Sequence, residues 1–374
     1  MLSNRDQNLP EDVVNEILSR LLVKSLLRFK CVCRYWYTLI KSPDFISKHF
    51  NQENNNGCLL SLKDIGNVVG PIDDIFLLHI PGYYSNSDRM ALWNPILREF
   101  NRIHVLEPIF PPNFHAVTNV VGFGLDPLTR DYKIIGIRDY VETIGDETYD
   151  LYYPYHVAAI YTLGKDSGRH FDLVTIPKDR TVYNSLCATC INGAYYWLSG
   201  LDYSEYRILS FDMRLEEFRK IEGPDHPEPK WGFLSLHNDS MGLFLCQTGV
   251  ILQSIIDIWV MEEEGCWTKL ITTNPFLEVF LPRGFWKEEL LFESQTNELV
   301  LYNHETHEMR NLEIYGCGSA LGLWAICYKE SLVSVFGQND EDGRRRGYQF
   351  FDAVHDFFIT SCCTSLGSRN PDPE

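Results

Sequence analysis

The sequence predicts a small all-α module followed by a large all-β domain. Apolar residues recur at helical spacing only within the first 50 residues. After them, short runs of Val, Ile, Tyr, Phe and Trp alternate with turn residues, which is typical of strands joined by hairpins. A chain of 374 residues is long enough for one small module and one large domain. We therefore divide it into residues 1–50, a polar linker at 51–57 and a domain at 58–374.

Charge is distributed unevenly between these parts. Residues 1–50 carry eight Lys/Arg and five Asp/Glu, net +3, and because the whole chain carries −18, residues 51–374 carry −21. A phosphate backbone is bound by a basic face, so the charge argues against nucleic-acid binding by the large domain. It favours a basic protein partner. The alternative is that the acidity only keeps a large domain soluble.

Nothing in the sequence predicts secretion or a membrane span. The segment Met1 to Pro10 is polar, and no apolar run approaches the ~18 residues of a membrane helix. The 11 cysteines are odd in number and follow no regular framework, so we expect thiols in a reducing compartment. The expected location is the cytoplasm, with the nucleus as a second compartment.

The first helix is predicted to begin at Pro10. Proline suits the first helical position because no backbone hydrogen bond is lost there. Glu11 and Asp12 then fall in the first turn, where the helix dipole favours negative charge. The apolar residues that follow at helical spacing are Val13, Val14, Ile17, Leu18 and Leu21.

A second apolar series predicts further helix up to Ser42-Pro43, where the residue before proline avoids the α region. Its members are Leu26, Phe29, Cys33, Trp36 and Ile40. A module of about 40 residues buries too little surface to be stable alone. Its apolar stripe therefore predicts a partner with a groove for helices.

The identities of these residues resemble the F-box motif. Residue type and spacing agree over Leu9 to Asp12, Ile17 to Leu21, Val23 to Arg34 and Trp36 to Phe45. The resemblance implies binding to a Skp-type adaptor and, through it, to a cullin, so that the chain would be a non-catalytic substrate-recognition subunit of a ubiquitin ligase. It assigns adaptor contacts to Leu9, Pro10, Ile17, Leu18, Leu21, Leu26, Val32 and Trp36. The alternative is that some of these residues only form the core of the module.

One position departs from the motif. Many F-box proteins have proline after the leucine that ends the first helix, where this chain has Leu22. We expect a looser turn at this position.

In the large domain, aromatic residues that follow an aliphatic residue recur at Trp93, Tyr161, Phe211, Trp259 and Tyr302, with gaps of 68, 50, 48 and 43 residues. A strand pair that repeats near this period is typical of propeller blades, with kelch-type repeats at about 50 residues. We predict a kelch-like β-propeller of six to seven blades, with a pair of β-sandwiches as the alternative. The aromatic side chains are expected in the blade cores.

Several of these stretches resemble the plant F-box-associated domain, in that family's order. They are Trp93-Asn94-Pro95, Gly122-Phe123-Gly124, Asp131-Tyr132-Lys133, Ile160 to Gly164, Asn192 to Trp197, Leu209 to Asp212 and Ile258 to Met261. Within that family the chain is most similar to the S-locus F-box group of pollen. This similarity implies ubiquitination of basic, non-self style ribonucleases in self-incompatibility. Many plant F-box proteins share the same framework, so a different target is the alternative.

Acidic residues gather in predicted loops of the large domain. Loops on a rigid scaffold are where recognition usually takes place, so we predict that these residues form a target-binding surface. They are Glu142, Asp146, Glu147, Asp150, Glu262, Glu263, Glu264, Asp340, Glu341 and Asp342. The alternative for each run is a solvated turn.

Motifs of catalysis or cofactor binding are not found. A P-loop, a Gly-x-Ser-x-Gly elbow and a His-Glu-x-x-His helix are absent from the sequence. Cys187 and Cys190 form a C-x-x-C without a second pair, and His304 and His307 flank a predicted hairpin turn without a third ligand. Gly316-Cys317-Gly318 is too short for a nucleotide site. We predict no cofactor and no metal; the rival hypothesis is a propeller enzyme or small-molecule sensor with a ligand at its central channel.

Overall fold

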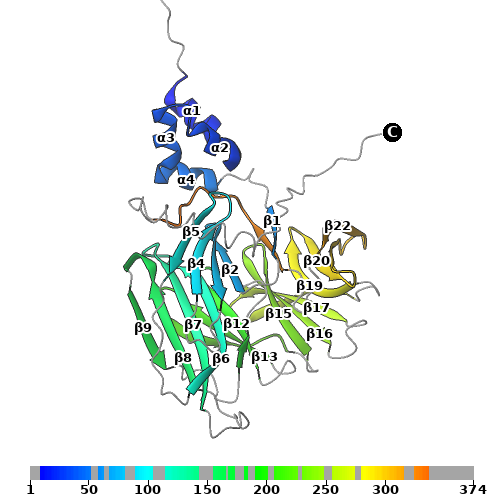
Figure 1. Cartoon of the computed structure of the whole chain (residues 1–374). Coiled ribbons are helices and arrows are strands. Elements are labelled where there is room, and N and C mark those ends of the chain that lie inside the picture. Colours follow the sequence, from blue (N-terminus) through cyan, green and yellow to red (C-terminus); the bar gives the residue numbers. More distant parts are fainter. Residues whose placement is uncertain are drawn as a thin grey trace, which may run out of the picture.

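The computed structural model describes residues 9–51, 58–62, 67–80, 89–103, 114–142, 155–165, 167–172, 181–183, 190–200, 206–225, 230–247, 255–273, 279–315 and 324–336. Helices fill the N-terminal part and strands fill nearly all of the rest, which confirms a small helical module followed by an all-β domain (Figure 1). The predicted linker lies outside the described residues except for Asn51.

Four short helices form the N-terminal module. They are α1 (Glu11–Ser19), α2 (Val23–Phe29), α3 (Arg34–Lys41) and α4 (Pro43–Phe50). Pro10 precedes α1 with extended backbone, so the helix begins at Glu11, one position after the predicted start. Ser42 and Pro43 end α3 as predicted, but they also begin α4: the Ser42 hydroxyl accepts from the Phe45 amide at 3.3 Å, and proline occupies the first turn.

Strands in the described part of the large domain form five antiparallel sheets, which are the blades. Blade 1 consists of β2 (Asn67–Ile72), β3 (Ile75–Ile80), β4 (Arg89–Asn94) and β5 (Glu99–Ile103). Blade 2 consists of β6 (Phe114–Leu125), β7 (Tyr132–Glu142), β8 (Tyr155–Thr162) and β9 (Ser167–Asp172), with the short helix η1 (Leu163–Lys165) between the last two strands. Blade 3 consists of β10 (Thr181–Tyr183), β11 (Cys190–Ile191), β12 (Ala194–Gly200), β13 (Tyr206–Asp212) and β14 (Glu217–Ile221). Blade 4 consists of β15 (Lys230–His237), β16 (Ser240–Gln247), β17 (Ile256–Glu263) and β18 (Cys266–Thr273). Blade 5 consists of β19 (Val279–Trp286), β20 (Glu289–Ser294), β21 (Glu298–Tyr302) and β22 (Met309–Tyr315). A two-stranded sheet pairs β1 (Cys58–Leu62) with β23 (Trp324–Tyr328), which joins the start of the domain to its last described strand.

The prediction of six to seven blades is wrong for the described residues, which form five. The five recurring aromatic residues each lie on the third strand of a different blade, β4, β8, β13, β17 and β21, where β10 and β11 of blade 3 count as one position because both pair with β12. The repeat therefore marks one strand per blade. Dividing the length of the domain by the period gave too many blades because connections and the β1–β23 pair also take up residues. A kelch-like repeat remains a prediction.

Each blade is antiparallel, so its turns fall on two opposite faces of the ring. The near face is the side that carries the turns between the first and second strands and between the third and fourth strands of each blade. The opposite side is the far face. In blade 2, Leu125 pairs with Tyr132 beside a near-face turn, whereas Phe114 pairs with Glu142 at the far-face end. Neighbouring blades agree in direction, because near-face residues of one contact near-face residues of the next, as Asp73 does with Arg130.

The helical module packs on the near face of blade 1 (Figure 1). Its core contains Leu18, Leu26 and Phe45, all at most 1% exposed, and it also includes Leu332 from the segment after β23. Ile96 and Leu97, in the turn between β4 and β5, pack against the same core. The two parts of the chain therefore share one hydrophobic core at their junction, which the division into separate domains did not predict.

Two glycines of the Gly122-Phe123-Gly124 motif allow blades 2 and 3 to pack closely. A Cβ on Gly122 would lie 2.6 Å from Trp197, and one on Gly124 would lie 2.6 Å from Met213. Those distances are too short for any side chain, so each glycine provides room for a side chain of blade 3. The two glycines of the motif are therefore explained by the close packing of blades 2 and 3.

Candidate protein-binding site

The helical module exposes large apolar side chains although its own core is filled. Twelve large hydrophobic residues are exposed in the described part of the chain, and seven of them lie in this small module. They are Leu9, Val13, Ile17, Leu22, Val32, Tyr35 and Tyr37. Such a concentration of exposed apolar side chains is typical of a protein-binding surface.

Part of this surface is one face of α1. Val13 and Ile17 are four residues apart in α1, so they lie on one side of the helix, with 41% and 49% of their surface exposed. Leu9, which precedes the helix, is 60% exposed. Desolvation, together with the nearby carboxylates of Glu11 and Asp12, raises the pKa of Tyr35. The start of α3 therefore lies near the start of α1, and the exposed residues of both belong to neighbouring surfaces.

The structure separates the predicted adaptor contacts into two groups. Leu9, Pro10, Ile17 and Val32 are exposed and available to a partner. Leu18 and Leu26 are 1% and 0% exposed in the core of the module, and Leu21 and Trp36 are half-buried around it. Adaptor contact by all eight residues remains a prediction, and the alternative of internal packing describes Leu18 and Leu26 in this structure.

Four exposed apolar residues were not among the predicted contacts: Val13, Leu22, Tyr35 and Tyr37. Val13 was recognised as apolar, but periodicity alone does not tell which part of a wide stripe faces outward. Leu22 has φ −61° and ψ 146°, and that φ is the value that proline enforces. The backbone at Leu22 therefore has a proline-like φ, and a looser turn stays a prediction.

The acidic residues predicted as one target surface lie on two faces. Glu262, Glu263 and Glu264 are exposed at the near-face turn between β17 and β18. Glu142 ends β7 on the far face. Asp146, Glu147, Asp150, Asp340, Glu341 and Asp342 lie outside the described residues. An 11-residue strand separates its two ends by roughly 33 Å, so the structure does not bring Glu142 and the three glutamates together.

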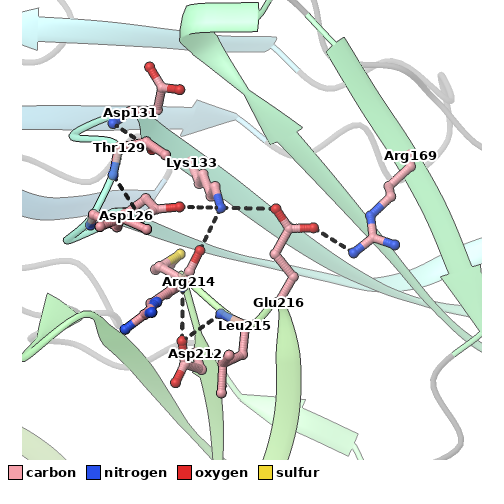
Figure 2. A network of polar contacts seen from close by, with 11 residues as sticks. Asp126, Thr129, Asp131, Lys133, Arg169, Asp212, Arg214, Leu215 and Glu216 are labelled. Carbon is pink, nitrogen blue, oxygen red and sulfur yellow. Dashed lines mark hydrogen bonds and ion pairs between the residues drawn. The ribbon is translucent and has the colours of Figure 1, made fainter.

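A buried polar network joins blades 2 and 3 (Figure 2). The ammonium of Lys133 lies 2.8 Å from Asp126 Oδ2 and 2.9 Å from Glu216 Oε1, and it donates to the Met213 carbonyl at 2.6 Å. Arg169 pairs with the other oxygen of Glu216 at 2.5 Å. Burial would raise the pKa of Asp126, but Lys133 and the amides of the adjoining turn outweigh it and lower this pKa to about 2. Every charge faces an opposite charge within the protein, which is the arrangement of a crosslink between blades.

The rival hypothesis predicted converging carboxylates and histidines at the central channel. Within the described ranges, no three His, Cys, Asp or Glu side chains are grouped so that they could hold a metal ion. Burial raises the pKa of the Cys190 thiol to about 11. Cys187 and Gly316-Cys317-Gly318 lie outside the described residues. Of the two histidines at the predicted hairpin turn, His307 is hydrogen-bonded within the blade, because its Nδ1 lies 2.9 Å from the hydroxyl of Tyr302.

A cleft of about 1120 Å³ lies between the helical module and the propeller. Its walls come from α3 and α4 on one side and from blades 1 and 2 and the segment after β23 on the other, including Lys41, Phe50, Arg130 and Tyr132.

No helix in the described residues has the length and apolar character needed to cross a membrane.

Comparisons with known proteins agree with this architecture. Residues 7–48 match the F-box domain, and residues 77–328 match the F-box associated beta propeller domain. The F-box/kelch-repeat protein At3g23880 of Arabidopsis thaliana is 27% identical, with 84% of this chain and 93% of the relative covered. The F-box protein CPR1 of Arabidopsis thaliana is 25% identical, with 83% and 86% covered.

Among solved structures, that of YjhT aligns with a TM-score of 0.39 at 11% identity, covering 66% of this chain and 83% of that chain. So loose a superposition adds nothing to the description of the fold. The domain matches, in contrast, cover the helical module and most of the propeller. The chain belongs to the plant F-box proteins that carry an F-box-associated β-propeller domain.

Proposed function

We propose that this chain is the substrate-recognition subunit of a Skp-cullin-F-box ubiquitin ligase. The observation that carries the proposal is the surface of the helical module, where seven large apolar side chains remain exposed after the module's core is complete. Burying them against a Skp-type adaptor would remove this apolar surface from water and supply the binding free energy. The chain itself then selects the target and takes no part in the chemistry.

The test uses exposed residues, because a change in the core would unfold the module. Val32→Asp replaces a side chain that is 60% exposed and should leave the fold intact. In an apolar groove an unpaired carboxylate costs several kcal/mol, so co-purification with the adaptor should be lost. Leu215→Asp, at a position 52% exposed on the propeller, is the matched control and should bind normally. Undiminished binding of the Val32 variant would contradict the proposal.

The target is proposed to meet the far face of the propeller. On this face β7 and β8 are separated by 12 residues and β5 and β6 by ten, whereas on the near face β2 and β3 are separated by two. The connection 143–154 contains three Tyr and three Asp/Glu. Long connections on a rigid scaffold often carry recognition, and tyrosine is enriched at interfaces.

The net charge of −21 in residues 51–374 favours a basic target, and the similarity to the S-locus group suggests style ribonucleases taken up by pollen. The cytoplasm, and as a second location the nucleus, is the proposed compartment. Immobilised chain should retain a basic style ribonuclease and not an acidic protein of similar size. Retention of neither, with adaptor binding intact, would leave the ligase role standing and exclude this target.

A further inference from the structure

The segment from Lys329 to Phe336 runs between the helical module and blade 1 (Figure 1). On the helical side, the Lys329 ammonium donates to the carbonyl of Phe50 at 2.8 Å and lies 5.2 Å from the centre of its ring. Leu332 is 4% exposed and belongs to the core of the module. Residues that follow the last described strand of the propeller thus complete a helical core formed by residues 14–46.

The same segment is also held by blade 1. Glu99 Oε2 accepts hydrogen bonds from the Ser334 hydroxyl at 2.6 Å and from the Val335 amide at 3.1 Å. Asn101 donates to the Val335 carbonyl at 3.2 Å. The side chains of Val335 and Phe336 pack into the core shared by blades 1 to 3. The segment is therefore held on both sides, and on the propeller side by three hydrogen bonds as well as by apolar packing.

Asn94 connects the two sets of contacts. This side chain is 1% exposed. Its oxygen accepts from the amides of Ile96 and Leu97 at 3.0 Å each, which shapes the turn that presents both residues to the helical core. Its nitrogen donates to the carbonyls of Ser331 at 3.3 Å and Val333 at 2.9 Å, on either side of Leu332. One carboxamide thus positions both the turn that carries Ile96 and Leu97 and the segment that carries Leu332.

The role of Asn94 differs from that of the residues at equivalent turns. Asp126, Asp212 and Asn303 also accept two amides from the turn that follows them. An aspartate can do this as well as an asparagine, because only the side-chain oxygen is used. At position 94 the side-chain nitrogen also donates to two carbonyl oxygens. The carboxylate of an aspartate has no donor there and would repel both oxygens.

We propose that residues 329–336 act as a splint that fixes the adaptor-binding helices on the propeller, and that Asn94 is the residue that positions this splint. With the 51–57 linker alone, seven residues would allow an end-to-end separation of roughly 15 Å and many orientations. The splint instead holds the adaptor surface and the far face in one orientation. The inference deepens the proposed function, because a fixed orientation determines which lysines of a bound target are presented to the ligase.

Hydrogen exchange of the full chain tests the splint without adaptor or target. In the variant Asn94→Asp, amides of α4 and of residues 329–336 should exchange about tenfold faster, the size expected from losing two buried hydrogen bonds. Amides of β15 to β18, far from the junction, should be unchanged. Asn303→Asp is the matched control and should exchange as the native chain does. Equal exchange in the two variants would overturn the proposal.

A second variant keeps the test decisive if Asn94→Asp folds poorly. Leu332→Ala leaves the hydrogen bonds of the propeller intact and removes only the side chain that enters the helical core. It should accelerate exchange in α3 and α4 and increase the maximum dimension measured by small-angle scattering. Unchanged scattering and exchange would show that the module is held without the splint. Because neither measurement involves the adaptor, failure of the ligase proposal is distinguishable through the Val32→Asp binding experiment.

Discussion

The ammonium nitrogen of Lys133 in blade 2 lies 2.9 Å from the carboxylate of Glu216 in blade 3, and the Lys133 side chain is only 6% exposed. A buried cation of this kind is stable only with its partners in place, so the network that surrounds it is sensitive to the loss of any member. It also couples two blades whose strands share no backbone hydrogen bonds, since each blade is a separate sheet.

Replacing Lys133 with Met should lower the free energy of unfolding by about 3–5 kcal/mol, because Asp126 and Glu216 would be left without their shared cation. Chemical denaturation monitored by tryptophan fluorescence measures the change. The double variant Lys133→Met with Asp126→Asn should be less destabilised than the sum of the two single variants, since the buried carboxylate is removed together with its partner. Additive effects would show that the two groups are not coupled.

Acid should reveal the role of Asp126. Its pKa is lowered to about 2 in the folded chain, so the stability it contributes is present above its ordinary pKa near 3.8 and is lost as pH falls toward 2. The variant Asp126→Asn should therefore be less stable than the native chain by about 2 kcal/mol at neutral pH, and the difference should disappear near pH 2. Asp212→Asn is the matched control, because asparagine retains the acceptor that its turn uses; a similar loss there would contradict the assignment.

Asp74 should behave in the opposite sense. Burial raises the pKa of this carboxyl to about 8, although its Oδ1 accepts from the Lys329 amide at 2.6 Å. A raised acid pKa means that the folded chain binds the extra proton, so native stability should fall as pH rises from about 4 to 8.

Asp74→Asn should remove that loss, and its melting temperature should exceed that of the native chain by an amount that grows over this pH range. Asparagine also tolerates the φ of +60° at this position. Asp73→Asn provides the contrast, because Asp73 pairs with Arg130 and accepts from Tyr132; this variant should be destabilised. A constant difference between native chain and Asp74→Asn at all pH values would exclude titration of Asp74 as the cause.

The packing of blades 2 and 3 predicts different outcomes for two neighbouring glycines. Gly122→Ala should destabilise the chain by about 1–3 kcal/mol, because the new methyl group would overlap Trp197 and Tyr195. Gly136→Ala, on the adjacent strand, should be nearly neutral, since the nearest atom to its Cβ is 4.0 Å away. Thermal unfolding of both variants, purified in parallel, measures the difference, and equal melting temperatures would show that the blades can move apart without cost.

Charge should govern how fast a basic target associates. Neutralising Glu262, Glu263 and Glu264 on the near face, or Asp146, Glu147 and Asp150 between β7 and β8, gives two triple variants with the same change in net charge. Only the set nearer the bound target should slow association several-fold, because the attraction is screened over about 8 Å at physiological ionic strength. We expect this to be the second set. An association rate that ignores salt, or equal effects of both sets, would refute recognition by local acidic loops.

The sequence alone determined the two-part architecture and the identity of its functional module. Amphipathic spacing in residues 9–42 predicted helices that bind a partner, and the residue types resembled an F-box. The recurring aromatics marked the third strand of each blade, because each blade repeats the same strand order. The number of blades was mispredicted, because connections and the β1–β23 pair also contribute to the length of the domain that was divided by the period.

Tertiary structure decided which residues face outward and how the two parts are joined. Periodicity gives the side of a helix that is apolar, but whether Leu26 is buried and Val32 exposed depends on what packs against each. The contact of Leu332 with the helical core links residues far apart in the chain, and the two carbonyls that meet the nitrogen of Asn94 flank that distant leucine. Both follow from the closure of the ring, in which β1 pairs with β23 and brings the end of the propeller back to its beginning. Such contacts depend on chain geometry in three dimensions, and no local pattern of residue types encodes them.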